Sequence, residues 1–380
     1  MSIGTYAIVE TTLREGEQSP QVHFTTDQKI DIAHALDEFG VEYLELTSPM
    51  ASEQSFEDAK RICALGLRTK VLTHVRCHMT DVKKAIDTGV DGVNMLFGSS
   101  EWLRKYSHGR SIDQIIEQAT EVASYVKSQG VEIRYSNEDA FRTAPEDLLR
   151  IYQAVDAIGV NRVGLADTVG IATPMQVYNV VSAVSGVVNA DIEFHAHNDT
   201  GCAIANALMA LEAGASLIDV TVLGIGERNG ITPLGGLIAR LYAIDKPLVQ
   251  KYQLKNLAPL ERLVADIIGM EIPMSNYITG GSAFYHKAGL HTNAVLKNPR
   301  AYEIFDPEDF GMSRTIEIGH RLAGWNALKA RAKELGLDFT DQELRDVAKL
   351  IKNTADQHPL SPAEVDTILR DEHAALQVAA

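Results

Sequence analysis

Residues Asp191-Ile192-Glu193-Phe194-His195-Ala196-His197 form a short run in which polar and apolar side chains alternate, and the run ends in two histidines. Alternation with a period of two is typical of a β-strand, whose successive side chains point to opposite faces. His195 and His197 are therefore predicted to project from one face, at the carboxyl end of the strand. The neighbouring segments decide what kind of sheet this strand belongs to.

Seven further runs have similar length and β-propensity. The eight predicted strands are Tyr6–Glu10, Tyr43–Ser48, Thr69–Val75, Gly92–Gly98, Glu132–Asp139, Arg162–Thr168, Asp191–His197 and Leu217–Glu227. Helix signals lie between them; for example, Thr26-Asp27-Gln28 begins a helical pattern that ends near Gly40, and Thr173-Pro174 begins another. The strands start 23 to 40 residues apart, which is the length of a strand plus a crossover helix, so a parallel sheet is predicted.

Eight such units predict an α/β fold, a closed (β/α)₈ TIM barrel, with an open doubly wound sheet as the alternative. Polar residues end nearly every predicted strand, which favours the barrel because only a barrel brings all eight ends to one mouth. We expect the barrel over residues 1–255, a connecting or lid subdomain over 256–320 and a helical subdomain over 321–380. Helical patterns in the last part cover Leu322–Leu335, Asp341–Thr354 and Pro362–Ala375.

The composition argues against several classes of protein. The chain has 380 residues, of which 45% are hydrophobic and 23% charged, as is usual for a globular protein. A net charge of −16 argues against a general binder of nucleic acid or anionic membranes. The three cysteines form no CxxC pair, and neither a secretory signal nor an 18-residue apolar run occurs. We therefore expect a cytoplasmic protein without a membrane or nucleic-acid partner.

The His195-x-His197 pair suits a divalent metal with nitrogen and oxygen ligands, although two hydrogen-bonded core histidines would give the same pattern. The first predicted strand leads into the segment Glu10–Gln18, which contains Arg14 and Glu15. Such a segment is often only a solvated charge cluster. Beside the two histidines, however, one carboxylate becomes a natural third ligand, and three protein ligands leave positions open for a chelating substrate.

Several other strand ends and loops carry candidate residues. Arg134, Ser136 and Glu138 share one strand face, where an arginine and a hydroxyl suit a substrate carboxylate and an internal Arg134–Glu138 ion pair is the alternative. The glycine-rich segment Gly224–Gly236 is either a phosphate-binding loop or a set of tight turns. His286–His291 lies outside the predicted barrel and offers a proton-exchanging or a structural histidine.

Four segments resemble, in the same order, those of the DRE-TIM metallolyase family. They are Glu10–Gln18, Ser136–Asp139, His195–Gly201 and Gly224–Gly236, and the resemblance extends to about residue 335. The Claisen-condensing members of this family are the homocitrate, 2-isopropylmalate, citramalate and Re-type citrate synthases. The resemblance implies a metal held by Glu15, His195 and His197, for which Mg²⁺, Mn²⁺, Zn²⁺, Fe²⁺ and Co²⁺ are all compatible.

Within this family, Gly226–Gly236, Thr73–His78 and His286–His291 are most similar to the homocitrate synthases. That branch implies an acyltransferase that condenses acetyl-CoA with 2-oxoglutarate to homocitrate and CoA, as in lysine biosynthesis. Oxaloacetate and 2-oxoisovalerate are alternative substrates, and a metal-dependent aldolase or lyase is an alternative class. Gln18-Ser19-Pro20 is closer to the isopropylmalate synthase pattern. Asn94 stands where lysine-inhibited relatives have Asp, so weak inhibition by lysine is expected.

The resemblance also assigns roles to single residues. Arg14 would stabilise the developing oxyanion, and His291, assisted by Glu138 and Tyr302, would remove a proton from the acetyl methyl group. The substrate carboxylates would be bound by Arg14, His74, Arg134, Ser136 and Thr168. His74 would contact the distal carboxylate, which a branched 2-oxo acid lacks. A homodimer is implied, in which the lid of one chain covers the barrel mouth of its partner.

Overall fold

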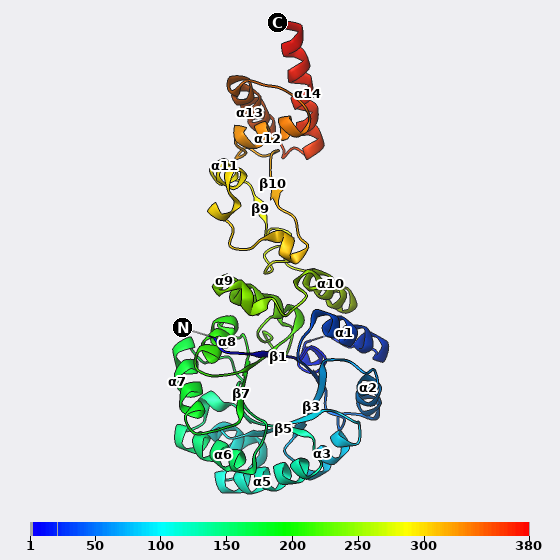
Figure 1. The fold of residues 1–380 in the computed structure, drawn as a ribbon, viewed down its shortest axis with the longest axis vertical. Coiled ribbons are helices and arrows are strands. Elements are labelled where there is room, and N and C mark those ends of the chain that lie inside the picture. The colour runs from blue at the N-terminus through cyan, green and yellow to red at the C-terminus, as the bar shows by residue number, and fades with distance from the viewer. Residues whose placement is uncertain (1–2, 21, 380) are drawn as a thin grey trace. The chain divides into compact units, whose positions relative to one another are not determined.

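The computed structural model describes residues 3–20 and 22–379. Within them, eight parallel strands close into a barrel in chain order (Figure 1). Closure is made by β1 and β8, where Ala7 lies opposite Leu217 and Glu10 opposite Val220. The strands are β1 (Ala7–Glu10), β2 (Tyr43–Leu46), β3 (Lys70–Arg76), β4 (Gly92–Gly98), β5 (Glu132–Glu138), β6 (Arg162–Asp167), β7 (Asp191–Ala196) and β8 (Leu217–Val220). The predicted TIM barrel is confirmed, and the open sheet is wrong.

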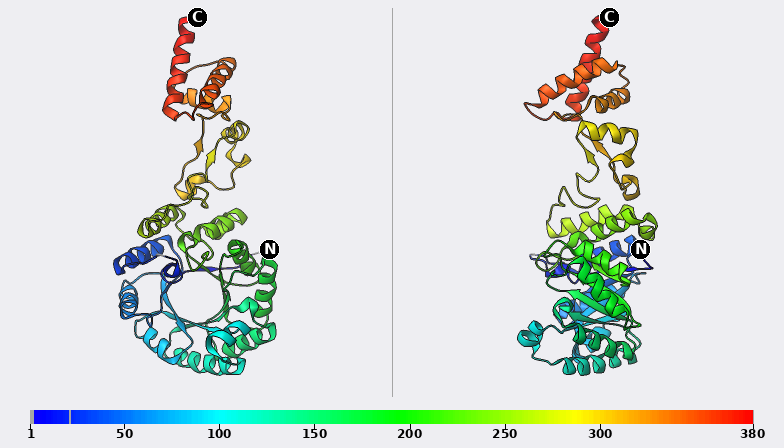
Figure 2. Two further views of the ribbon diagram at one scale, coloured as in Figure 1. Left: turned by 180° about the vertical axis from the view of Figure 1, so that it is seen from behind. Right: turned by 90° about the vertical axis from the view of Figure 1, so that its left-hand side faces the viewer.

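Helices surround the ring of strands, as the left view of Figure 2 shows. They are α1 (Thr26–Phe39), α2 (Glu53–Cys63), α3 (Met79–Ile86), α4 (Glu101–Leu103), α5 (Ile112–Ser128), α6 (Pro145–Ile158), α7 (Pro174–Ser185), α8 (Ala203–Glu212), α9 (Leu234–Ile244) and α10 (Leu257–Ile268). Local sequence explains their ends. A capping box of Thr25 and Gln28 begins α1, and Gly40, the residue after its last turn, caps it with φ of 98°. Thr173 caps α7 in the same way, and Pro174 takes its first position.

The last strand is shorter than predicted. Instead of running to Glu227, β8 ends at Val220, and the chain turns sharply where Leu223 and Gly224 adopt positive φ. Gly230 packs so closely that an added Cβ would lie 1.8 Å from the Gly224 carbonyl oxygen. The glycines of this segment therefore serve a tight loop that closes on itself.

The chain folds as two compact units, residues 1–272 and 273–380. The second unit contains β9 (Tyr285–His286), α11 (Gly289–Lys297), β10 (Thr315–Ile316), α12 (Trp325–Glu334), α13 (Asp341–Ala355) and α14 (Pro362–Ala379). Leu328, Leu344, Ile351 and Leu369 are buried in its core. The finer division at residues 255 and 320 stays a prediction. None of the helices in the described part of the chain combines the length and apolarity needed to cross a membrane.

Charged side chains cross the interior of the barrel. Arg134 Nη1 on β5 lies 2.5 Å from Glu193 Oε1 on β7, 3.4 Å from Glu45 Oε1 on β2 and 3.7 Å from Asp219 Oδ2 on β8. Because β5 pairs only with β4 and β6 in the ring, these contacts span the barrel. The absence of a side chain at Gly164 leaves space for the Arg134 side chain, because a Cβ at position 164 would lie 2.5 Å from Arg134 Nε.

The buried charges do not balance. Among the described residues of this network, the guanidinium groups of Arg14, Arg134 and Arg162 face four buried carboxyl groups, those of Glu15, Glu45, Glu193 and Asp219. A surplus charge that cannot reach water is removed most cheaply by protonating one acid. Glu193 is that acid: burial, together with nearby Asp219, raises its pKa to about 8 against the pull of Arg134 and Arg162.

We predict that Glu193→Gln flattens the dependence of folding stability on pH. The folded protein holds the Glu193 proton more tightly than the unfolded chain does, so raising the pH from about 5 to 8 lowers the free energy of unfolding. This one group contributes roughly 2–4 kcal/mol to that loss. The amide of the variant keeps the shape of the neutral acid and carries no proton to lose. Urea titrations at pH 5.5 and 8 measure the difference, with the partly exposed Glu132→Gln as control. Equal pH slopes in wild type and Glu193→Gln would contradict the assignment.

Candidate active site and metal centre

A cavity of about 250 Å³ lies in the barrel unit and brings most of the predicted site residues together. Its lining includes Arg14, Glu15, His74, Arg134, Ser136, Glu138, Thr168, His195 and His197. These side chains come from β3, β5 and β7, from the residues that follow β6 and β7, and from the segment after β1. Carboxyl ends of parallel strands meet at one mouth of a barrel, which is why residues far apart in the sequence share one cavity.

Glu15, His195 and His197 form a group that could hold a metal ion. The two Nε2 atoms of His195 and His197 lie 3.4 Å apart. Glu15 Oε2 is 3.9 Å from His195 Nε2, and Glu15 Oε1 is 4.0 Å from His197 Nε2. Ligand atoms about 2 Å from a shared cation are separated by distances close to these.

The protonation state of His195 suits metal binding. Its Nδ1 lies 2.9 Å from Asp219 Oδ2, and a carboxylate at this distance accepts the Nδ1 proton. The lone pair of Nε2 is then free and points at His197, as in other carboxylate–histidine–metal arrangements. Burial and the neighbouring His197 hold the pKa of His195 well below its usual value, so the ring is neutral. Two facing imidazole nitrogens and a carboxylate match the donor set of a divalent cation.

Arg14 and Glu15 are held by a chain of ionic contacts. Arg14 forms an ion pair with Glu15 and donates from Nε to Glu45 Oε2 at 2.6 Å. Glu15 Oε1 also accepts the backbone N–H of Glu227 at 2.9 Å, so the loop after β8 helps to place it. Burial would raise the pKa of Glu15, but Arg14 and the two histidines outweigh it and lower the pKa to about 2. Glu15 is therefore an anion.

The predicted binding residues His74, Ser136 and Thr168 come from β3, from β5 and from the position after β6. His74 Nδ1 is 3.3 Å from Glu45 Oε1, the same atom that accepts from Asn94 Nδ2 at 2.6 Å. Ser136 donates to the Gly164 carbonyl oxygen. Thr168 Oγ1 accepts the Asp139 N–H, so its own proton remains available to a ligand. Burial lowers the pKa of His74.

Glu138 lines the cavity together with two other carboxyl groups, those of Glu15 and Glu227. Burial raises the pKa of Glu138, with Asp139 and Glu227 adding to the effect. The raised pKa makes the Glu138 carboxylate a stronger base than an exposed one, which suits a role in proton transfer. Arg134 pairs with Glu193 rather than with Glu138, so the alternative of an internal Arg134–Glu138 pair is wrong.

The second unit contains the other two predicted catalytic residues. The rings of His291 and Tyr302 stack with centroids 4.2 Å apart, and both side chains are exposed in this unit. Glu303, the residue after Tyr302, is held in place by two partners. It accepts hydrogen bonds from both Nε and Nη2 of Arg314, and it lies 2.7 Å from His286 Nε2. His286 is thus structural, whereas His291 is open to a ligand.

Two buried acids that the sequence reasoning missed support the site. Glu45 binds Arg14 and lies beside His74, and Asp219 orients His195. Each interrupts an apolar strand, in Tyr43-Leu44-Glu45-Leu46 and Leu217-Ile218-Asp219-Val220. An acidic residue inside such an apolar strand indicates a buried partner for its side chain, because burying an unpaired carboxylate costs free energy.

Comparisons with known proteins agree with this geometry. The HMGL-like family model matches residues 5–264, and a second model, described as homocitrate synthase post-HMGL domain-like, matches residues 278–359. The mitochondrial homocitrate synthase of Schizosaccharomyces pombe is 57% identical over 98% of this chain and 90% of that protein. The cytosolic isozyme of Saccharomyces cerevisiae is 55% identical over 98% of this chain and 87% of its own length.

Solved structures support the fold. An HMG-CoA lyase from Brucella melitensis has a TM-score of 0.61 and 21% identity, over 70% of this chain and all of the other. At that identity the likeness concerns the barrel alone. The family models and the relatives that are more than half identical carry the assignment further: this chain belongs to the HMGL-like family, in its homocitrate synthase branch.

Proposed function

We propose that this chain is a homocitrate synthase, which condenses acetyl-CoA with 2-oxoglutarate and water to homocitrate and CoA. One observation supports this most directly: Glu15, His195 and His197 line the same cavity as Arg134, His74 and Ser136. A metal-ligating triad beside donors for carboxylates suits a 2-oxo dicarboxylate. Relatives that bear the name homocitrate synthase and are 55–57% identical over nearly the whole chain support the same reaction.

A divalent cation held by Glu15, His195 and His197 would act as a Lewis acid toward the keto group of the substrate. Arg14 lies against Glu15 with a guanidinium that stays charged, since Glu45 and Glu15 outweigh the effect of burial on its pKa. It is placed to stabilise the negative charge that develops on the keto oxygen. Ser136, Thr168 and Arg134 would orient the carboxylate next to the keto group, and His74 the distal one.

The carbon–carbon bond requires a nucleophile made from the acetyl methyl group. We assign proton removal to His291, with Glu138 and Tyr302 assisting, and the resulting enolate attacks the keto carbon. Hydrolysis of the thioester then releases CoA and makes the sequence irreversible. The exposed, stacked pair of His291 and Tyr302 supports a role toward a ligand outside its own unit. In this proposal the chain forms a homodimer, and the second unit of one chain covers the barrel mouth of its partner.

The compartment is a further part of the proposal. The relatives include a cytosolic isozyme as well as mitochondrial enzymes, and we propose that this protein works in the cytoplasm.

We predict that Glu15→Gln abolishes stoichiometric metal binding. The substitution removes the only anionic member of the proposed ligand set, and the purified variant should retain less than about a tenth of the wild-type divalent metal. Inductively coupled plasma mass spectrometry of the dialysed protein measures the metal and identifies it. Glu17→Gln is the matched control, because the Glu17 carboxylate lies two residues away and binds Thr47 and Lys29 instead. Equal metal content in the two variants would rule out Glu15 as a ligand.

A panel of 2-oxo acids tests the reaction directly. With acetyl-CoA, 2-oxoglutarate should release CoA thiol with a kcat/KM at least about 100-fold above that of 2-oxoisovalerate, because a site built for a distal carboxylate is left with unpaired polar groups by an apolar chain. Thiol release is followed with a chromogenic disulfide. Preference for oxaloacetate or 2-oxoisovalerate would replace the proposed substrate, and the absence of thiol release with every acid would overturn the class.

We predict that His291→Ala lowers kcat by about 100-fold or more and changes 2-oxoglutarate binding little, because a general base acts on the acetyl group alone. His358→Ala removes another exposed imidazole of the same unit and should keep the wild-type kcat. Near-normal turnover of the His291→Ala variant would show that His291 is not the general base.

Mixing inactive His291→Ala with inactive Glu15→Gln tests the exchange of lids, since mixed dimers regain one intact site. Mixtures that stay inactive after subunit exchange would count against it.

A further inference from the structure

One side chain, that of Arg228, ties together three of the loops that build the candidate active site. Arg228 lies in the loop after β8 and lines the same cavity as the metal-ligating triad. Its Nε and Nη2 donate to Oδ1 and Oδ2 of Asp199, at 2.9 and 3.0 Å, and Nη2 also donates to the Thr168 carbonyl oxygen at 2.7 Å. Asp199 lies in the loop after β7, and Thr168, a proposed binder of the substrate carboxylate, follows β6. We call these contacts of Arg228, Asp199 and Thr168 the Arg228 clip.

The clip also reaches two of the candidate metal ligands through the chain. Asp199 lies two positions after His197. Glu227, the residue before Arg228, donates its backbone N–H to Glu15 Oε1 at 2.9 Å. The loops after β7 and β8 therefore each carry one end of the clip and one contact with the triad.

The backbone conformation at Arg228 is strained. Its φ is 55°, in the left-handed region that residues other than Gly, Asn and Asp rarely adopt. Such strain persists only where the surrounding contacts determine the conformation, and it is concentrated at functional sites. The clip supplies such contacts, because two parallel bonds to a carboxylate fix the plane of the guanidinium. The Arg228 side chain is 39% exposed, and an ion pair so near water contributes little to stability alone. Stability therefore does not explain the strain.

We propose that Arg228 is a positioning residue for the active site. Through Asp199 and Thr168 it fixes the loop after β8, and through that loop it fixes the Glu15 carboxylate before metal and substrate bind. It touches no reacting atom in this role. The inference rests on the proposed function, in which Glu15 binds the metal and Thr168 the substrate. Loosening the clip should therefore weaken the binding of both metal and 2-oxoglutarate.

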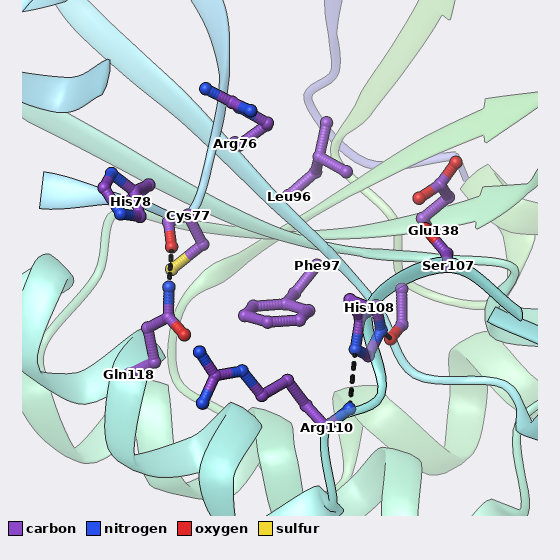
Figure 3. Close-up of a pocket in the computed structure, with 11 residues that line it drawn as sticks. Arg76, Cys77, His78, Leu96, Phe97, Ser107, His108, Arg110, Gln118 and Glu138 are labelled. Carbon is purple, nitrogen blue, oxygen red and sulfur yellow. Dashed lines mark hydrogen bonds between the residues drawn. The ribbon is translucent and has the colours of Figure 1, made fainter. Parts of the chain in front are cut away.

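A larger cavity beside the site provides an internal reference. It has a volume of about 480 Å³ and shares Leu96 and Glu138 with the candidate active site. Figure 3 shows its lining, and none of the described residues that line it belongs to the clip. The Cys77 N–H in this cavity donates to the Leu96 carbonyl oxygen at 3.0 Å. Loosening the clip should leave that bond unchanged.

Amide hydrogen exchange of the metal-free protein tests the clip without any ligand. Arg228→Asn removes the guanidinium but keeps a residue that tolerates the left-handed backbone. Two reporter amides are those of Glu227 and of Asp139, which donates to Thr168 Oγ1 at 2.8 Å. Both should exchange at least about 10-fold faster in the variant than in wild type, because the groups that accept their bonds are no longer held. The Cys77 amide should keep its wild-type rate.

The affinity of the metal-free protein for Mn²⁺, measured by calorimetric titration, tests the consequence of the clip. Arg228→Asn should bind Mn²⁺ about 10-fold more weakly than wild type, as is typical when a group that orients a metal ligand is removed. At saturating metal, the variant should raise the KM for 2-oxoglutarate and leave the KM for acetyl-CoA within about 2-fold of wild type. Arg228→Lys should recover part of the Mn²⁺ affinity, because a lysine keeps the charge but not the paired bonds.

Arg331→Gln is the matched control. It removes an arginine whose Nε and Nη2 bind the two Asp366 oxygens at 2.8 and 2.7 Å, in the second unit. This variant should match wild type in reporter exchange and in Mn²⁺ affinity. An equal loss of affinity in Arg331→Gln would overturn the proposal, because the effect would then be one of overall stability. Wild-type exchange at both reporter amides in Arg228→Asn would also overturn it.

The positioning role and the proposed reaction can fail separately. If wild type binds no Mn²⁺ and turns over no 2-oxo acid, but Arg228→Asn speeds exchange at both reporter amides, the reaction fails and the positioning role stands. If wild type turns over 2-oxoglutarate and Arg228→Asn matches it in Mn²⁺ affinity, the reaction stands and the positioning role fails.

Discussion

The contact of Arg134 with Glu193 across the barrel is the constraint on which the rest of the site depends. The guanidinium also lies near Glu45 and Asp219, so one side chain from β5 connects β7, β2 and β8. Each of these acids then acts on a residue of the cavity: Asp219 orients His195, and Glu45 holds Arg14. Ions in the interior of a barrel, such as the Arg14 guanidinium and the Glu45 carboxylate, are costly to desolvate, and their mutual attraction repays that cost only when the geometry is good. Removing one partner of such a pair typically costs about 3–5 kcal/mol.

This network explains why the cavity is preorganised. His195 is kept neutral with its Nε2 lone pair directed at the proposed metal position, and Glu15 is kept ionised beside Arg14. A site that holds its charges before the substrate arrives loses little free energy to reorganisation during reaction. The loop after β8 contributes as well, because the Glu227 N–H binds Glu15. The glycines of that loop therefore allow the tight turn that brings the Glu227 N–H to Glu15, a candidate metal ligand.

Much of this protein was accessible from its sequence. The spacing of β-rich runs and the polar residues at their ends predicted the barrel, and the pairing of β1 with β8 confirms it. The same pattern predicted that Arg14, Glu15, Arg134, Ser136, His195 and His197 share one cavity, as they do. The end of β8 was placed too late, because Leu223 takes a left-handed conformation that local propensity does not favour. Glu45 and Asp219 were missed because one acid inside an apolar strand does not say which distant cation it meets.

The sequence by itself determined the alternation of strands and helices, the resemblance to one family and the residues that offer metal-ligating and carboxylate-binding groups. These follow from local periodicity and from side-chain chemistry, which every short segment carries with it. Only the tertiary structure decided that Arg134 pairs with Glu193 rather than with Glu138, and that burial raises the pKa of Glu193 to about 8. Those properties depend on burial and on charges from strands distant in the sequence, and both exist only after the barrel has closed.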